Sequence, residues 1–449
     1  MKKLFSSAFL LAAASSVVAG TLAFYCSTDK KDGIYKVNEK IVFTATLKED
    51  GAVPQDKTIR YRLYHGSKIV KRGQISAKET LKIETSGTAP NWIRLAVWAY
   101  DAKGKAVKQK NSYGSVVAYS ADCGAMVSPY EITPTTKEPE DFDKFWQDAK
   151  KELAAVPVEV REMKEIPDKE LRIYDVKISC AGDKPVSGIL CIPRNAKSKS
   201  APAVISFHGA GVHSASPDRF HAQLGAITFN VNAHGIENGK PKEFYQNLRK
   251  TYYYTTQDEF RKTRYALWNK HDRNKYYMRG MYIRVLRALE YVKTLPEWDG
   301  KHLAVTGGSQ GGTQTLVAAA LDKDVTFARA GVPGWCDLSG VTEGRQSGGG
   351  LVYTLKEAES NPSLVKNVSY FDCMFLAKRI KCPIYINTGF VDTVCSPSSV
   401  FAAYNLIPAT TEKHLQLTPA GGHGTAKHTQ GLAALAEYVK KVVKKDKAK

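Results

Sequence analysis

LAVTGGSQGGTQTLVAAALDK, residues 303–323, places four glycines around Ser309, between a short apolar run and a series of small helix-forming residues. A phosphate-binding P-loop requires a lysine followed by Ser or Thr after its last glycine, and no lysine follows Gly312. The dinucleotide fingerprint GxGxxG does not match the spacing either. The remaining pattern is GxSxG from Gly307 to Gly311, in the order strand, sharp turn and helix that is typical of a nucleophile elbow.

Two further residues complete a chemical pattern with Ser309. A serine hydroxyl becomes a good nucleophile when a base removes its proton, and sites of this kind order the residues as nucleophile, acid and histidine. Asp392 lies in FVDTVCSP after the strand-like run CPIYINTG, and His423 lies in AGGHGT after HLQLTP. A loop aspartate or a loop histidine alone would be unremarkable. Three residues in the right order after successive candidate strands predict a triad of Ser309, Asp392 and His423.

An oxyanion hole is expected beside this serine. The stretch SFHGAG, residues 206–211, ends an earlier strand at the place where such a site supplies a backbone amide. The amides of Ala210 and Gln310 are therefore the candidate donors to a developing oxyanion. Both are backbone groups, so substitution of their side chains would test them poorly.

Residues 126–449 alternate short apolar runs with helical patterns such as YYMRGMYIRVLRALEYVKTL. This alternation predicts a mostly parallel sheet with helices on both faces. Ligand sites in such sheets form beyond the C-terminal ends of the strands, where all the candidate loops fall. The expected strands are LRIYDVKISC and VSGILCIP as a hairpin, then APAVISFHG, AITFNVNAHG, HLAVTGG, FARAGVPG, CPIYINTG and HLQLTPAGG.

Residues 24–125 have a different pattern, with period-two runs such as KIVFTATL and IRLAVWAYD between turn-rich segments. This spacing predicts a small immunoglobulin-like β-sandwich. Trp92, Trp98 and Tyr100 could form a sugar-stacking face, although packing in the core and between domains is the favoured interpretation. A linker with three prolines leads from this domain into the next.

An insertion at residues 236–276 interrupts the strand and helix rhythm and is rich in aromatic residues. A segment of this length within a compact domain is typical of a lid or binding element. It either forms an aromatic platform over a cleft or packs on its own aromatic side chains, and the sequence does not separate the two. His234, Tyr253 and Trp268 are the candidate substrate-binding residues.

The first 23 residues, MKKLFSSAFLLAAASSVVAGTLA, have the pattern of an export signal. We expect a periplasmic or secreted protein that begins near Gly20 or Phe24. Lipidation at Cys26 is the weaker interpretation, because the bulky Tyr25 precedes it. No later apolar run has the roughly 20 residues needed to span a bilayer.

The chain has 449 residues and a net charge of +21, which falls to +19 when Lys2 and Lys3 are removed. Part of this charge lies in the tail KKVVKKDKAK, and no nucleic-acid-binding motif accompanies it, so nucleic acid is not an expected partner. Whether the charge selects an anionic substrate stays open.

The cysteines offer no metal site, because they lack the paired CxxC spacing. Cys26 and Cys123 bracket the first domain, and the sequence leaves open whether they form a disulfide. The other six are interpreted as small buried hydrophobic residues: Cys180, Cys191, Cys336, Cys373, Cys382 and Cys395.

Residues 132–438 resemble the acetyl xylan esterase and cephalosporin C deacetylase family of α/β-hydrolases. The resemblance is carried by HGAG, YYMRGMYIRVLRALEYVKTLPEWDGKHLAVTGGSQGG, GFVDTVCSP and GGHG. It implies an α/β-hydrolase fold, the triad and oxyanion hole given above, and removal of acetyl groups from acetylated carbohydrate of the xylan or xylo-oligosaccharide type. It also implies that neither a metal nor an organic cofactor is needed.

The chain departs from that family's usual pattern at three places. AHGIENG replaces the usual Arg-Gly-Gln, Gly424 replaces the glutamate after the histidine, and Ile283 and Arg284 stand near the usual aspartate. These departures leave the triad intact but leave the substrate range and the formation of a homo-oligomer open.

Three alternative functions are also compatible with parts of the sequence. A serine peptidase of the prolyl oligopeptidase type shares fold and triad order, but about a hundred N-terminal residues cannot build its β-propeller. A second is a feruloyl or glucuronoyl ester hydrolase with the same machinery. A third is an inactive glycan-binding protein, which the intact triad disfavours.

Overall fold

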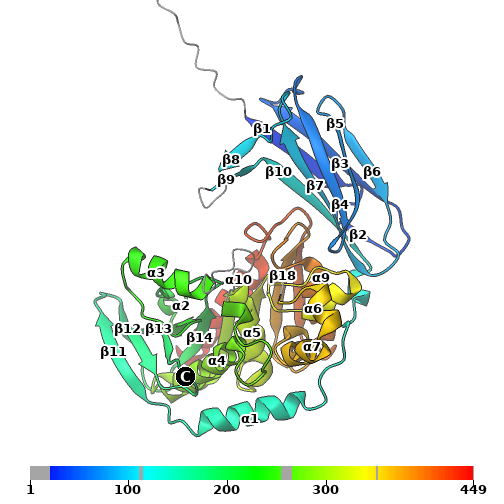
Figure 1. Cartoon of the computed structure of the whole chain (residues 1–449). Coiled ribbons are helices and arrows are strands. Elements are labelled where there is room, and N and C mark those ends of the chain that lie inside the picture. Colours follow the sequence, from blue (N-terminus) through cyan, green and yellow to red (C-terminus); the bar gives the residue numbers. More distant parts are fainter. Residues whose placement is uncertain (1–20, 111–114, 254–264, 350–351, 448–449) are drawn as a thin grey trace, which may run out of the picture.

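The computed structural model describes residues 21–110, 115–253, 265–349 and 352–447, which form an N-terminal β-sandwich and a C-terminal α/β domain (Figure 1). The candidate signal at residues 1–23 lies almost wholly outside the described residues. Strand β1 begins at Leu22, before the expected domain start at residue 24.

The sandwich consists of a three-stranded sheet, β1-β3-β6, and a five-stranded sheet, β2-β10-β7-β4-β5. In β3 every second side chain is buried, because alternate residues face the core between the sheets. A separate hairpin, β8 with β9, projects from this unit. The strands are β1 (Leu22–Thr28), β2 (Ile34–Tyr35), β3 (Ile41–Glu49), β4 (Thr58–His65), β5 (Lys68–Ser76), β6 (Leu81–Thr85), β7 (Asn91–Tyr100), β8 (Lys108–Lys110), β9 (Val116–Ala118) and β10 (Ser120–Val127).

Cys26 and Cys123 face the same sandwich core from β1 and β10, and both are free thiols. A contact with Cys26, together with burial, raises the pKa of the Cys123 thiol.

The C-terminal domain is built on a nine-stranded sheet of order β11-β12-β13-β15-β14-β16-β17-β18-β19. Along this order, the neighbours from β11 to β15 pair antiparallel. The neighbours from β15 through β14 to β19 pair parallel. The predicted fold class is therefore confirmed, and β11 is an additional edge strand. The strands are β11 (Val160–Ile166), β12 (Leu171–Ile178), β13 (Val186–Pro193), β14 (Ala201–Phe207), β15 (Ile227–Asn232), β16 (Trp298–Gly308), β17 (Phe327–Gly331), β18 (Ile384–Gly389) and β19 (Lys413–Thr418).

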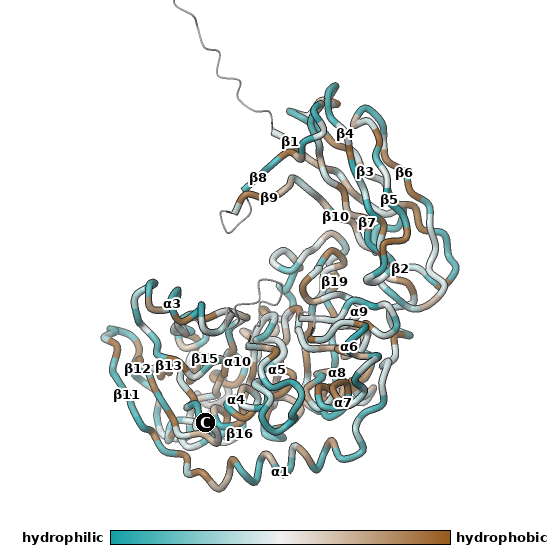
Figure 2. The backbone as a smooth tube through the Cα atoms, in the orientation of Figure 1, coloured by the Kyte–Doolittle hydropathy of each residue, from teal (hydrophilic) through white to brown (hydrophobic). Residues whose placement is uncertain are grey.

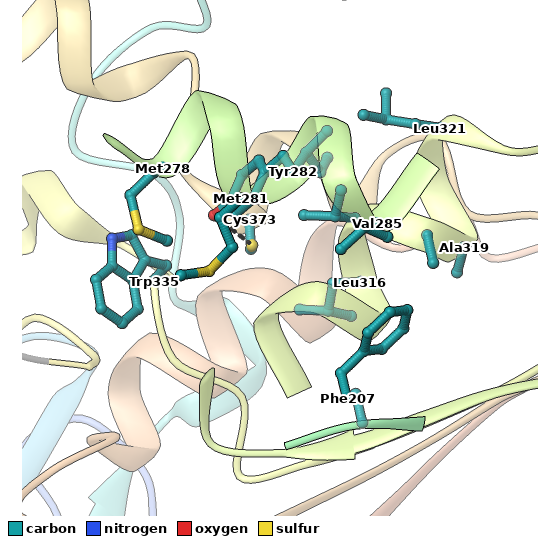
Figure 3. Close-up of a cluster of buried hydrophobic side chains, with 14 of the residues drawn as sticks. Phe207, Met278, Met281, Tyr282, Val285, Leu316, Ala319, Leu321, Trp335 and Cys373 are labelled. Carbon is teal, nitrogen blue, oxygen red and sulfur yellow. Dashed lines mark hydrogen bonds between the residues drawn. The ribbon is translucent and has the colours of Figure 1, made fainter. Parts of the chain in front are cut away.

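Helices cover both faces of this sheet because its strands are apolar on both sides; every residue of β13 is buried. On one face α4 packs on α5, and Figure 3 shows Met281, Tyr282 and Val285 of α4 against Leu316 of α5. On the other face α10 covers the central strands. The helices are α1 (Phe142–Ala154), α2 (Arg219–Gln223), α3 (Lys242–Tyr253), α4 (Tyr277–Thr294), α5 (Gln310–Leu321), α6 (Leu355–Ser360), α7 (Pro362–Ser369), α8 (Cys373–Ala377), α9 (Pro397–Leu406) and α10 (Thr429–Lys447), with short 3-10 helices η1 (Pro129–Glu131), η2 (Tyr265–Leu267) and η3 (Leu338–Glu343).

Helix α1 follows the linker and runs across the C-terminal domain on the side away from the sandwich (Figure 1). Its residues alternate between hydrophobic and hydrophilic in Figure 2, and its buried side chains recur at helical spacing, as expected from the sequence. Among the helices that the structure describes, none has the length and apolar character that crossing a bilayer requires.

Candidate active site

The GxSxG sequence forms a strained turn between β16 and α5. Ser309 adopts φ 58° and ψ −122°, a conformation that side-chain-bearing residues rarely adopt. The flanking glycines leave no room for side chains. A β-carbon at Gly307 would lie 2.4 Å from the Gly311 carbonyl oxygen, and one at Gly311 would lie 2.1 Å from the Phe207 carbonyl oxygen. The turn therefore requires glycine at both positions.

The turn brings Ser309 to the two residues predicted to be its partners. Ser309 Oγ lies 3.0 Å from His423 Nε2, and His423 Nδ1 lies 2.9 Å from Asp392 Oδ2. Asp392 and His423 lie in the loops that follow β18 and β19, at the C-terminal edge of the sheet. The structure thus joins all three residues in one hydrogen-bonded chain.

Asp392 is completely buried, and its environment fixes its orientation. While Oδ2 faces His423, Oδ1 accepts hydrogen bonds from the amides of Val394 at 2.8 Å and Cys395 at 2.9 Å. A buried carboxylate needs such partners, because an unpaired charge costs several kcal/mol in a protein interior. The carboxylate is therefore held in the orientation that suits a bond to the histidine.

The two expected oxyanion donors belong to the turn that carries the serine and to a loop that borders it. Gln310 is the first residue of α5, where the helix leaves the backbone N–H without an intrahelical acceptor. The Ala210 amide donates to no residue that the structure describes. A β-carbon placed on the neighbouring Gly209 would lie 3.9 Å from Ser309 Cβ, so this loop borders the nucleophile. Both amides are thus available to an oxyanion.

His208, part of the HGAG motif, holds the loop that contains Ala210 in place through hydrogen bonds. Its Nε2 accepts a hydrogen bond from the Ala233 amide at 3.1 Å, so the ring proton is on Nδ1, which donates to the Gly209 carbonyl oxygen at 2.7 Å. Burial, reinforced by the nearby ring of His213, lowers the pKa of His208 to about 4. His208 is therefore neutral at neutral pH and connects the two loops.

His234 lies behind the loop and not on an open surface. Its side chain is completely buried, with Nε2 3.2 Å from the Gly211 carbonyl oxygen and Nδ1 2.6 Å from the Tyr277 hydroxyl. Burial lowers the pKa of His234 well below its usual value. Since both ring nitrogens have protein partners, the predicted direct contact of His234 with substrate does not fit the structure. The burial follows from the aromatic residues that surround it.

The described part of the insertion packs on its own aromatic rings. Tyr252 and Tyr265 lie with ring centroids 4.7 and 4.6 Å from that of His234, and Trp268 lies 5.4 Å from Tyr252. The Tyr265 hydroxyl donates to Gln310 Oε1, so the insertion contacts the residue that follows the nucleophile. Of the two interpretations left open by the sequence, the described residues fit packing better.

Of the other two candidate binding residues, Trp268 lies at a cavity, whereas the side chain of Tyr253 is not described. Trp268 is half-buried and lines a cavity of about 570 Å³ with Tyr252 and Tyr277. Those tyrosines and His234 lie between this cavity and the loop at Gly211. Tyr253 ends helix α3, but its side chain lies outside what the structure describes, as do residues 254–264.

The sandwich contacts the loop that carries Asp392. The indole Nε1 of Trp92 donates a buried hydrogen bond of 2.7 Å to the Phe390 carbonyl oxygen. A β-carbon at Gly124 of β10 would lie only 1.8 Å from the same oxygen, so the two backbones meet directly. Trp92 belongs to the core of the C-terminal domain and not to that of the sandwich. Nothing in the local sequence pattern indicates this contact beyond the expectation that Trp92 packs in the core or between domains.

Within the described ranges, the His, Cys, Asp and Glu side chains form no group of three or more that could hold a metal ion.

A serine in a strained strand-to-helix turn, with histidine and buried aspartate from later loops, defines the class of α/β-hydrolases with a serine nucleophile. A model of the acetyl xylan esterase (AXE1) family matches residues 128–441. The chain therefore belongs to the acetyl xylan esterase family and is a carboxylic ester hydrolase. The match begins after β10, so the sandwich lies outside it.

Known relatives agree with this membership. The acetyl esterase Axe7A of Xylanibacter ruminicola is 33% identical over 322 residues, which cover 71% of this chain and 70% of that protein. The acetyl xylan esterase of Paenibacillus sp. R4 has a TM-score of 0.58 and 25% identity, and the match covers 69% of this chain and 98% of that chain. For acetyl xylan esterase 1 of Thermoanaerobacterium sp. JW/SL YS485 the TM-score is 0.57, with 24% identity and coverage of 70% and 97%, which supports the fold.

Proposed function

We propose that this protein is a serine esterase that removes acetyl groups from acetylated xylan or xylo-oligosaccharides through an acyl-enzyme. The observation that carries the proposal is the hydrogen-bonded chain from Ser309 through His423 to the buried Asp392. The names of the relatives point to the same substrate class, since each is an acetyl esterase or an acetyl xylan esterase.

In the first half of the reaction His423 Nε2 takes the proton of Ser309 Oγ, and that oxygen attacks the acetyl carbonyl carbon. The negative charge that develops on the carbonyl oxygen is stabilised by the amides of Ala210 and Gln310. Asp392 orients the imidazole and stabilises its positive charge. When the carbon–oxygen bond to the sugar breaks, His423 returns the proton to the sugar oxygen.

In the second half water replaces the sugar. His423 takes a proton from the water, whose oxygen attacks the acetyl carbon bound to Ser309. The tetrahedral species collapses to acetate, and Ser309 Oγ recovers its proton from His423. The two halves release one deacetylated sugar hydroxyl and one acetate for each water consumed.

Substitution Ser309→Ala tests the proposal directly. We expect acetate release from acetylated xylan to fall roughly 10⁴-fold or more, because the attacking oxygen is removed. Ser198→Ala is the matched control, since Ser198 is exposed and precedes the opposite end of β14. Release of acetate by Ser309→Ala near the wild-type rate would disprove the assignment.

The alternative activities give distinct results with the wild-type protein. Cleavage of a prolyl 4-nitroanilide in preference to 4-nitrophenyl acetate would indicate a peptidase. Faster hydrolysis of feruloyl or glucuronoyl esters than of acetyl esters would indicate an esterase that uses the same triad on esters of a different acid. Binding of xylan without hydrolysis of any acetyl ester would indicate a glycan-binding protein.

We also propose that the protein is exported, on the basis of the N-terminal sequence. Since β1 pairs with β3 from Leu22 onward, cleavage near Gly20 keeps this strand whole. N-terminal sequencing of protein from the periplasm or medium should find a start close to residue 21. Protein found in the cytoplasm with Met1 retained would contradict export.

A further inference from the structure

A half-open cleft lies between the sandwich and the C-terminal domain. Its volume is about 440 Å³, within the range of 300–1,000 Å³ that is common for small-molecule sites. The sandwich supplies one wall from β4 and β7, and the loops after η3 and β18 supply the other. Its lining includes Tyr64, Arg94, Arg345, Thr393 and Val394.

The cleft borders the loop that carries Asp392. Thr393 and Val394 line it and follow Asp392 directly in the chain. The Val394 amide donates to Asp392 Oδ1 at 2.8 Å, while its side chain is 46% exposed. A ligand in the cleft would therefore contact the loop whose aspartate is bonded to His423.

The charges in the cleft disfavour an anionic ligand. Arg94 is paired with Asp122, and the two guanidinium nitrogens Nε and Nη2 of Arg345 lie 2.8 and 3.0 Å from the carboxylate of the buried Asp337. Each cation is thus balanced by its own carboxylate. A neutral, polar ligand fits this pattern better than a phosphate or a uronate.

Tyr64 gives the cleft an aromatic surface. The guanidinium of Arg94 covers its ring at 4.4 Å from the centroid, which fixes the ring from one side. Tyr64 is half-buried, and its hydroxyl makes no hydrogen bond with any residue that the structure describes. A pyranose ring has an apolar C–H face that packs on an aromatic ring, and hydroxyls that can bond a phenol at its edge.

Contacts on either side keep the two walls together. The amide of Ser67, in the turn that follows β4, donates to the Gly344 carbonyl oxygen at 2.8 Å, and Trp92 bonds Phe390 on the other side. The cavity at Trp268 differs from this cleft, because the rings of Tyr252, Tyr277 and His234 lie between it and the loop at Gly211.

We propose that the interdomain cleft is a subsite for the neutral xylopyranose chain of the substrate, with Tyr64 as its stacking platform. The proposal rests on the proposed deacetylase function, in which an acetylated sugar is held at Ser309. It gives the sandwich a role in recognition of long substrates, while the triad alone acts on short ones.

Substitution Tyr64→Ala tests this subsite with substrates of two sizes. On acetylated xylo-oligosaccharides long enough to reach the cleft, we expect the KM of Tyr64→Ala to be roughly five times that of the wild type, because a stacking contact is lost. The kcat of the variant should be little changed. For 4-nitrophenyl acetate, which cannot reach the cleft, kcat/KM should stay at the wild-type value. Tyr64→Phe keeps the ring and should retain most of the length dependence.

Tyr100→Ala is the matched control, because Tyr100 lies in the same sheet under Arg60, at 3.9 Å, but does not line the cleft. Equal KM values for the two alanine variants on long substrates would overturn the subsite. An equal loss for Tyr64→Ala on 4-nitrophenyl acetate would also overturn it, since the effect would then come from the interface.

A binding measurement separates this proposal from the deacetylase function. Calorimetry with unacetylated xylo-oligosaccharides on Ser309→Ala, with and without Tyr64→Ala, needs no turnover. Weaker binding in the double variant supports the subsite even if acetate release fails in the wild type. Binding that is equally strong, or absent in both, rejects it.

Discussion

The triad is flanked by two supports of different kinds. On the Asp392 side, the sandwich meets the backbone of the loop: the Phe390 carbonyl oxygen lies against the backbone of Gly124 and accepts a hydrogen bond from the Trp92 side chain. On the Ser309 side, the insertion meets the helix α5 through side chains, with the Tyr265 hydroxyl on Gln310. The first support joins two domains, and the second lies within one.

This difference predicts how each support tolerates change. A contact between backbones leaves no side chain that can move aside, so an added atom must displace a domain or a loop. A contact between side chains can relax through rotamers, and its loss removes one hydrogen bond of about 0.5–1.5 kcal/mol. Substitutions on the Asp392 side should therefore affect activity more.

The largest effect is expected from Gly124→Ala. Its β-carbon would lie 1.8 Å from the Phe390 carbonyl oxygen, so the Asp392 loop must shift. Because a misplacement of about 1 Å can cost roughly 10²-fold in rate, we expect a fall of that order in kcat for 4-nitrophenyl acetate. Gly73→Ala in the same sheet is the control, since it meets only the end of the Tyr61 side chain. Unchanged kcat in Gly124→Ala would show that the loop does not depend on the sandwich.

A smaller effect is expected from Trp92→Phe, which keeps an aromatic ring but removes the donor to Phe390. A buried carbonyl left without its partner costs about 1–3 kcal/mol, so kcat should fall roughly tenfold.

Trp98→Phe on the same strand is the control for this experiment, because Trp98 is half-buried beneath Arg62. A loss of thermal stability in Trp92→Phe with an unchanged kcat would mean that Trp92 only joins the domains and does not position the acid.

Tyr265→Phe should have a weaker effect. It removes the hydroxyl bonded to Gln310 Oε1 but leaves the backbone amide of Gln310 in place. We expect kcat to fall roughly two- to fivefold, with little change in KM. Tyr245→Phe, which removes a hydroxyl bonded to the Glu237 carbonyl oxygen within the same insertion, is the comparison. A fall larger than that of Trp92→Phe would reverse the ranking of the two supports.

The smallest effect at neutral pH is expected from His208→Asn, and acid should shift the comparison in favour of the variant. The pKa of His208 is about 4 in the folded protein and about 6.5 in an unfolded chain, so the unfolded state binds more protons between these values. The stability from the neutral ring is complete above about pH 6.5 and is lost as the pH falls towards 4.

Thermal unfolding at several pH values checks this prediction. Burial raises the pKa of Asp372 to about 7, which has the opposite effect on stability, so the variant must be compared with the wild type at each pH. The wild type should lose more stability than His208→Asn between pH 6.5 and 4. If the stability of the two proteins falls in parallel as the pH is lowered, His208 is not the source of the pH dependence.

Much of the fold followed from local pattern. The six runs predicted as strands after the hairpin are β14 to β19, because each is a short apolar segment that ends in turn residues. The short helices α6, α7 and α8 were not predicted, since segments of five to eight residues give weak periodicity. The place of Ser309 could be predicted because an elbow needs glycine at fixed positions.

Other features of the site depended on contacts that no local pattern contains. His234 was expected at the substrate but is enclosed by Tyr252, Tyr265 and Tyr277. His208 was part of a motif, yet its tautomer depends on the Ala233 amide from another loop. Trp92 bonds a carbonyl 298 positions away in the chain.

The sequence alone was sufficient for the elbow, the order of the triad and the parallel sheet, because glycine spacing and apolar periodicity act over a few residues. The tertiary structure was needed to place His423 3.0 Å from Ser309 and to set the sandwich against the Asp392 loop. Such contacts form only when distant segments bury their surfaces together, and which surfaces meet is a property of the packed whole.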